Sequence, residues 1–181
     1  MKWLTRIVIG ILIIILVGFF GLWIAGQRSD RGHFAASIMI DRPINEVYNA
    51  LIDPEMTKKW VSGIAEIKRL TPGNTHVGTK LLLIEDVSGH RVSMEEEITD
   101  LQPPRLVKYT TQSQGNPLHS FTELGEYQLE EKDGKTQFTL DSHITYHGFL
   151  YSLFEPLITP SVKSKFAGDQ MTLKKILEQG K

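Results

Sequence analysis

The chain of 181 residues contains no cysteine. Without thiols it has no disulfide scaffold, no cysteine-ligated zinc finger and no cysteine nucleophile. Positive charge is not in excess either, because 20 Lys and Arg face 21 Asp and Glu. The formal net charge of −1 argues against a generally basic nucleic-acid-binding protein, and we expect no nucleic-acid partner. The length allows one ordinary domain, with or without a short appendage.

Three motifs of common catalytic sites are also missing. The sequence has no G-x-S-x-G for an acyl-transfer serine, no G-x-x-x-x-G-K-[ST] for phosphate binding and no G-x-G-x-x-G for a dinucleotide. We therefore predict no cofactor.

One long hydrophobic run lies near the N-terminus. Residues 7–25 are 19 uncharged residues, of which 16 are hydrophobic and three are glycine. As a helix rising about 1.5 Å per residue, the run is roughly 28 Å long, close to the hydrocarbon thickness of a bilayer. Trp3 and Trp23 lie near its ends, and Arg6 and Arg28 flank it, as at a membrane interface. We predict a retained transmembrane helix.

A cleaved signal peptide is the alternative interpretation of this run. Its apolar core would be shorter and would end in small residues, whereas cleavage after Ala25 would put bulky Trp23 at the −3 position. Two basic residues and the α-amino group precede the run and two basic residues follow it. The positive-inside rule therefore slightly favours a cytoplasmic N-terminus, with the main domain outside the cytoplasm.

The near-neutral total charge is the sum of a basic N-terminal segment and an acidic remainder. Residues 1–32 hold four basic residues and one acidic residue, so residues 33–181 keep 16 basic and 20 acidic residues, a net charge of −4. A mildly acidic domain does not bind anionic lipid headgroups through its general charge. Proximity to the bilayer would have to come from the anchor.

The remainder of the chain has the patterns of a small α+β domain. Pro43 opens a short helix with apolar residues at helical spacing, and Asp53-Pro54 ends it. Strands are predicted at residues 34–41, 64–70, 79–87, 90–100, 106–113, 121–131 and 135–146, and short helices at 43–52 and 55–60.

A long helix is predicted after residue 148. Pro156 and Pro160 interrupt its apolar start. Beyond them Val162 and Phe166 begin an apolar stripe, and Lys165 is one of four lysines that lie mostly on the opposite side. An antiparallel sheet needs its apolar face covered, and this helix is the only predicted element long enough to cover it.

Two turns predict the register of their strand pairs. Asp133-Gly134 is a strong two-residue hairpin signal that puts Lys132 opposite Lys135. Ser88-Gly89 does the same for the earlier pair. Counting back from the turns gives Leu129–Phe138, Tyr127–Leu140, Gly125–Ser142, Glu123–Ile144 and Phe121–Tyr146 in one hairpin, and Asp86–Arg91, Glu85–Val92, Leu83–Met94 and Leu81–Glu96 in the other.

Three local patterns, together with the element order, carry a family resemblance. They are IDRPINEVYNALIDPEMTKKW, ITDLQPPRLVKYTTQ and GEYQLEEKDGKTQFTLDSHITYHG. Over about residues 34–179 the chain resembles the START-like superfamily, also called SRPBCC or Bet v 1-like, in its polyketide cyclase/dehydrase branch. The resemblance implies an α+β helix-grip fold, in which a curved antiparallel sheet of about seven strands wraps around a long C-terminal helix and leaves an apolar cavity.

Members of this superfamily bind lipids, sterols or polyketides, and some are cyclases. A membrane anchor departs from the commonest soluble arrangement. We expect a transmembrane anchor over residues 1–26, a linker over 27–33 and a START-like domain over 34–181. In the implied cavity, the side chains predicted to contact a ligand are Trp60, Leu83, Met94, Glu96, Tyr109, Phe121, Tyr127, Leu140, Ser142 and Phe166.

Three carboxylates, those of Glu85, Glu96 and Glu123, share faces with apolar residues and point toward that cavity. Burial without a partner raises a carboxyl pKa, which is how a general acid or base arises. Alternatively, all three lie near the cavity mouth or strand ends and are solvated. No nucleophile accompanies them, so Glu96 and Glu123 are catalytic candidates in a chain that we expect to be a binding protein rather than an enzyme.

The pair His143 and His147 has the spacing of a metal-binding HxxxH motif. On a strand, four residues advance roughly 13 Å, too far for both imidazoles to reach one ion. Both histidines also fall on the face opposite Phe138 and Leu140. We predict no metal site.

Gly125 opposite Ser142 leaves little side-chain volume on the inward face of its hairpin. The gap provides space for a ligand, relieves sheet curvature, or does both. We therefore predict membrane-anchored binding of a hydrophobic small molecule such as a lipid, an isoprenoid or a polyketide-like compound. A cyclase or dehydratase with an inward carboxylate and a ligand-free envelope scaffold remain open, and the sequence indicates no oligomeric state.

Overall fold

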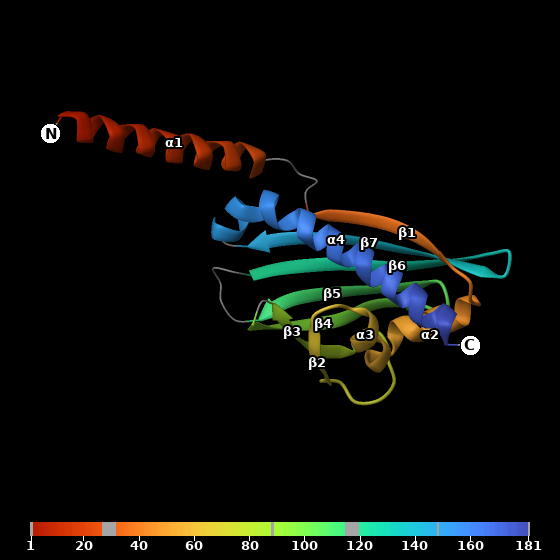
Figure 1. Ribbon diagram of the computed structural model, residues 1–181. Helices are drawn as coiled ribbons and strands as arrows, with labels where there is room; N and C mark the ends of the chain where they lie inside the picture. Colours follow the sequence, from red (N-terminus) through yellow and green to blue (C-terminus); the bar gives the residue numbers. More distant parts are fainter. Residues whose placement is uncertain (1, 27–31, 88, 115–119, 148, 181) are drawn as a thin grey trace.

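Seven antiparallel strands form one sheet in the order β1-β7-β6-β5-β4-β3-β2 (Figure 1). The computed structural model describes residues 2–26, 32–87, 89–114, 120–147 and 149–180. The strands are β1 (His33–Ile40), β2 (Ile64–Arg69), β3 (Lys80–Val87), β4 (His90–Gln102), β5 (Leu106–Gln114), β6 (Ser120–Lys132) and β7 (Lys135–His147). The helices are α1 (Lys2–Gly26), α2 (Ile44–Ile52), α3 (Pro54–Trp60) and α4 (Phe149–Gln179).

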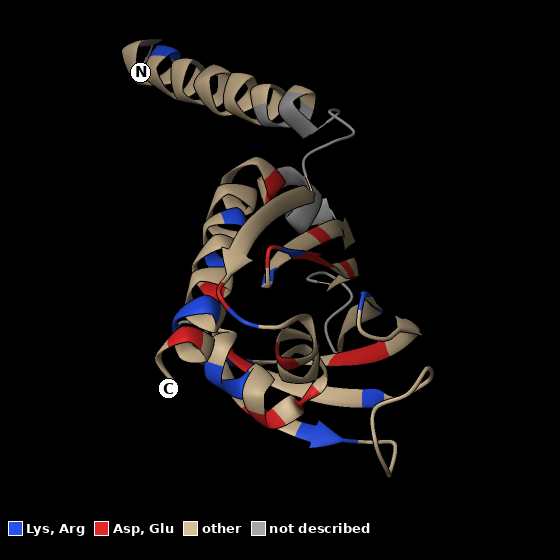
Figure 2. Ribbon diagram, turned by 90° about the vertical axis from the view of Figure 1, so that its right-hand side faces the viewer, with Lys and Arg blue, Asp and Glu red and all other residues tan. Residues whose placement is uncertain are grey.

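The long helix α4 crosses one face of the curved sheet, as expected for a helix-grip fold (Figures 1 and 2). It contacts β1, β7 and α3, and α2 contacts β6 and β7. Close packing is concentrated under the C-terminal half of α4, where Ile40, Val47, Phe138 and Leu173 are fully buried. This core anchors one end of the helix and leaves its N-terminal half to cover a different part of the sheet.

Both predicted hairpin registers are confirmed. Asp133 and Gly134 have φ angles of 52° and 76°, as a two-residue type I′ turn requires, and all the predicted β6–β7 pairs are present. The four predicted β3–β4 pairs are present as well. Ser88 of the earlier turn lies outside the described residues. The registers follow from local turn chemistry, so the inward faces of four strands were predictable.

Helix α4 does not end at its prolines, contrary to the predicted interruption. Pro156 and Pro160 both lie within a continuous helix. Each proline lacks an N–H donor and its ring crowds the carbonyl four residues earlier, yet the helix continues to Gln179. Between them, Ile158 is half-buried against the domain, whereas Leu157 is largely exposed.

The N-terminal helix α1 lies apart from the hydrophobic core (Figure 2). Its segment Trp3–Gly21 has a mean hydropathy of 2.6 and is long and apolar enough to cross a membrane. None of that segment is buried within the described chain, although α1 contacts α4. The linker predicted at 27–33 lies mostly outside the described residues.

Candidate functional site

A cavity of about 590 Å³ lies between the sheet and the N-terminal half of α4. Strands β2 to β7, together with α3 and α4, contribute its walls. Period-two alternation directs every second side chain of these strands inward, so apolar and aromatic residues dominate the lining. Val87 and Leu157 line the cavity and are 47% and 63% exposed, which places them at its mouth.

Nine of the ten side chains predicted to contact a ligand line this cavity. They are Trp60, Leu83, Met94, Glu96, Tyr109, Phe121, Tyr127, Leu140 and Phe166. Ser142 is the exception, because it is fully buried behind Glu123 and does not reach the cavity. Contact between these residues and a ligand stays a prediction.

The gap predicted at Gly125 is not available to a ligand. A Cβ atom at Gly125 would clash with the ring and hydroxyl of Tyr109, which reaches across from β5. The glycine therefore makes room for a tyrosine of this chain. The sequence prediction considered only the two strands of the hairpin and missed the side chain from the third.

Glu123 is a buried carboxylate with two hydrogen-bond donors. The hydroxyls of Tyr109 and Ser142 each donate to its Oε1 at 2.9 Å. Burial raises the pKa of Glu123, and these two hydrogen bonds oppose the rise. Ser142 thus acts behind the cavity wall by orienting an inward carboxylate.

Glu96 faces the same cavity, but its carboxyl group accepts fewer hydrogen bonds than that of Glu123. Its only hydrogen bond among the described residues comes from the Thr111 hydroxyl, at a long 3.5 Å. Burial, followed by the negative charge of Glu123, raises the pKa of Glu96 to about 7. The registers place Glu96, Thr111 and Glu123 side by side on β4, β5 and β6. The cavity floor therefore carries a polar row of two carboxyl groups.

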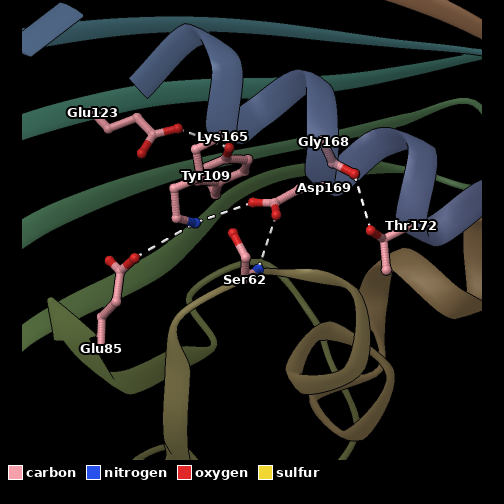
Figure 3. A network of polar contacts seen from close by, with 8 residues as sticks. All are labelled: Ser62, Glu85, Tyr109, Glu123, Lys165, Gly168, Asp169 and Thr172. Carbon is pink, nitrogen blue, oxygen red and sulfur yellow. Dashed lines mark hydrogen bonds and ion pairs between the residues drawn. The ribbon is translucent and has the colours of Figure 1, made fainter. Parts of the chain in front are cut away.

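Lys165 lies inside the cavity wall, which corrects the expectation that it sits opposite the apolar stripe. Its Nζ lies 3.0 Å from Asp169 Oδ2 and 3.5 Å from Glu85 Oε1 (Figure 3). Asp169 is almost fully buried, and its Oδ1 accepts a hydrogen bond from the Ser62 backbone N–H at 2.9 Å. Sequence reasoning missed Lys165 and Asp169 as site residues. The available signal was their spacing of three and seven residues from Val162, which puts all three on one helical face.

Aromatic rings surround the carboxyl row. Tyr127 lies 5.0 Å from Tyr109 and 6.2 Å from Trp60 between ring centroids. The buried indole N–H of Trp60 has no hydrogen-bond partner among the described residues. The cavity thus has mainly apolar walls, aromatic faces and a few polar groups, which is typical of a small-molecule site.

On the opposite face of the sheet, the His147 ring lies 2.9 Å from the Thr122 hydroxyl. The structure brings His33, Asp141 and His143 together, with possible ligand atoms within 4.8 Å of one another. His33 hydrogen-bonds Asp141 at 2.9 Å and stacks on His143. Contacts within the cluster account for its arrangement. Sequence reasoning missed it because β1 and β7 are about a hundred residues apart.

A curved sheet closed by a long helix over an apolar cavity defines a helix-grip ligand-binding domain. The family described as polyketide cyclase / dehydrase and lipid transport matches residues 31–178. The chain belongs to this family. No curated protein matches it in sequence.

Solved structures share the fold at low sequence identity. A conserved protein from Geobacillus kaustophilus is 18% identical with a TM-score of 0.69, covering 81% of this chain and 95% of that one. The Zhui aromatase/cyclase from Streptomyces sp. R1128 is 16% identical with a TM-score of 0.65, covering 81% and 93%. Ara h 8.0201 is 16% identical with a TM-score of 0.62, covering 82% and 98%. These proteins consist almost entirely of the shared fold, so the fold forms without a further domain.

Proposed function

We propose that the chain binds a hydrophobic small molecule, such as a lipid, an isoprenoid or a polyketide-like compound, in the cavity beneath α4. The observation that carries this proposal is the cavity of about 590 Å³ with its mainly apolar lining. Its volume falls within the range of roughly 300–1,000 Å³ that is usual for small-molecule sites. Each 100 Å² of apolar ligand surface removed from water contributes roughly 2.5 kcal/mol before the costs of association.

A transmembrane anchor over residues 1–26, a linker over 27–33 and a ligand-binding domain over 34–181 form the second part of this proposal. The apolar helix α1 supports the anchor, with a cleaved signal sequence as the alternative. The charge bias around the helix slightly favours a domain outside the cytoplasm. Exposed Leu157 and Phe154 on α4 would then hold the cavity mouth near the bilayer, where such ligands dissolve.

Ligand recovery tests the binding proposal directly. Residues 33–181 contain the whole sheet, α4 and the core, so this domain is purified without detergent and its extract is analysed by mass spectrometry. We expect a hydrophobic molecule from the native domain and much less from Leu83→Trp, which fills the cavity. Leu124→Trp is the control, because Leu124 is 59% exposed and does not line the cavity. Equal recovery from all three proteins, or none from the native domain after exposure to a total lipid extract, contradicts the proposal.

An acid/base enzyme of the cyclase or dehydratase type is the second candidate. The observation that favours it is the row of Glu96 and Glu123 facing the cavity. Burial raises the pKa of both carboxyl groups there, that of Glu96 to about 7. If Glu96 transfers protons, Glu96→Gln retains an unreacted molecule that is heavier by one water than the molecule recovered from the native domain. Identical molecules in both proteins would remove Glu96 from any such reaction. A ligand-free scaffold would be favoured if side chains filled the space under the N-terminal half of α4, whereas a cavity of about 590 Å³ is present there.

A further inference from the structure

We propose that the ligand of this cavity carries a protonated amine and that Glu96 is the binding site for that group. This inference rests on the proposed binding of a hydrophobic molecule and adds the chemistry of its polar end. Glu96 lies midway along β4, where Leu83 and Met94 line the cavity beside it. The apolar part of the ligand would fill the remaining space under α4.

The Glu96 carboxyl group has unused hydrogen-bonding capacity. Glu123 receives two donors at 2.9 Å, whereas Glu96 receives a single long contact from Thr111. A carboxylate accepts up to about four hydrogen bonds, and burial without partners is costly. When an apolar ligand displaces water from the cavity, the ligand itself must supply the missing donors. An ammonium group supplies three, a hydroxyl supplies one and a carboxylate supplies none.

The charged groups of the cavity wall are mostly acidic. Four carboxyl groups line the cavity, from Glu85, Glu96, Glu123 and Asp169, against a single lysine. Lys165 is bound between Glu85 and Asp169 (Figure 3). Among the described residues, no cation forms an ion pair with Glu96 or Glu123. A cationic group would supply the missing positive charge, whereas an anionic headgroup would meet like charge.

Aromatic side chains surround Glu96. Tyr109 and Tyr127 line the same cavity, and Tyr109 is two residues along β5 from Thr111, which lies opposite Glu96. Trp60 packs edge-on against Tyr127 in the same wall. Aromatic faces next to a carboxylate attract cations, and the attraction is stronger when water is excluded. Neutral or anionic groups gain nothing comparable from these rings.

Three amphiphiles with the same tail test the headgroup directly: dodecylamine, dodecanol and dodecanoate, each below its critical micelle concentration. Trp60 is the only tryptophan in residues 33–181, so its fluorescence reports on the cavity itself. At pH 8 we expect dodecylamine to bind the domain at least about tenfold more tightly than dodecanol, because hydrogen bonds to charged groups are stronger. Dodecanoate should bind weakest.

Two variants test whether Glu96 is responsible for the preference for the amine. Glu96→Gln should lose at least about tenfold in dodecylamine affinity while its dodecanol affinity changes less than about threefold. Glu97→Gln is the matched control, because Glu97 is the next residue on β4, faces away from the cavity and pairs with Lys80. It should bind all three amphiphiles like the native domain.

The outcomes separate this inference from the function on which it rests. If none of the amphiphiles binds the native domain, the proposed function fails. If all three bind equally, or dodecanoate binds tightest, the amine inference is wrong while hydrophobic binding stands. Retention of the amine preference by a folded Glu96→Gln domain overturns the assignment to Glu96. The three amphiphiles are compared on the native domain without any variant. This comparison therefore tests the amine inference even if Glu96→Gln does not fold.

Discussion

Glu96 and Glu123 lie in one row on the cavity floor, but their surroundings differ. Hydroxyls from two neighbouring strands support Glu123, and only a distant threonine reaches Glu96. Both carboxyl groups have raised pKa values because burial disfavours their charged forms. Glu96 accepts fewer hydrogen bonds than Glu123, so its carboxyl group is the one that responds to a ligand or to pH.

The raised pKa of Glu96 predicts a pH-dependent stability. Between about pH 4.5 and 7 the folded state holds this proton more tightly than the unfolded state, so stability falls as the pH rises through that window. Glu96→Gln removes this contribution. Relative to the native domain, the variant should gain on the order of 2–3 kcal/mol between pH 4 and pH 8.

Urea denaturation of both proteins at several pH values measures this difference. Thr111 and the titratable groups Glu123, Tyr109 and Tyr127 are the same in both proteins, so their effects largely cancel. A stability difference that stays constant from pH 4 to pH 8 would show that Glu96 keeps an ordinary pKa.

Gly125 should tolerate no larger residue, although it lies in a regular strand. In Gly125→Ala the new methyl group displaces the Tyr109 ring, which loses its hydrogen bond to buried Glu123. Overpacking and the lost bond together should cost about 2–3 kcal/mol of unfolding free energy in a denaturant titration.

Gly168→Ala is the matched control for that substitution. Gly168 is exposed on α4, and nothing lies within 4 Å of its added methyl group. Alanine should raise the stability there by up to about 1 kcal/mol, because alanine favours helix. If the two substitutions have equal effects, the contact between Gly125 and Tyr109 is unimportant for stability.

At the scale of elements, α4 performs two tasks along its length. Its C-terminal half packs into the core through Leu173, and its N-terminal half covers the cavity. Asp169 lies near the boundary and joins α4 to the segment after α3 through the Ser62 backbone N–H. Together with Lys165 and Glu85, this contact connects the helix to the far side of the cavity (Figure 3).

Asp169→Ala should therefore destabilise the domain and loosen the cavity. The substitution leaves the Ser62 N–H without its acceptor and Lys165 with Glu85 alone, at an expected cost of about 2–3 kcal/mol. Chemical denaturation measures the loss, and hydrogen exchange should report faster exchange at Ser62. Glu131→Ala, at an exposed residue of β6, should change neither. Native-like exchange at Ser62 in Asp169→Ala would contradict this account.

At the scale of the whole molecule, α1 lies outside the hydrophobic core of the helix-grip domain, although it contacts α4. No part of Trp3–Gly21 is buried, and the family match begins only at residue 31. Deletion of residues 1–32 should give a detergent-free soluble domain whose unfolding midpoint in urea matches that of the full chain within error.

Full-length protein, by contrast, should sediment with membranes and resist extraction by alkaline carbonate. Its intact mass should include the N-terminal segment. A mature chain that starts beyond residue 25 would identify α1 as a signal sequence. A domain that stays with membranes after the deletion would point to a second membrane-binding surface, with Phe154 and Leu157 as the first residues to test.

Much of the fold and part of the site were predictable. Turns at Asp133-Gly134 and Ser88-Gly89 predicted nine strand pairs correctly beyond the turn itself. Alternation along the strands then placed seven of the predicted residues on the cavity wall, and Trp60 and Phe166 reach it from α3 and α4. The filling of the Gly125 gap, the position of Lys165 and the cluster at His33 were not predicted. The filling of the gap and the His33 cluster depend on contacts between different strands, whereas Lys165 had a local signal in its spacing from Val162.

The sequence by itself determined the helices, the strands, the hairpin registers and the apolar N-terminal segment, because these depend on side chains within a few residues of one another. Only the tertiary structure decided which inward groups have partners. Tyr109 fills the space over Gly125, Lys165 turns inward between Glu85 and Asp169, and Glu96 is left with one long hydrogen bond. Whether an inward side chain has a hydrogen-bond or ion-pair partner depends on the side chains that the other walls of the cavity supply. Those walls are built from residues elsewhere in the chain.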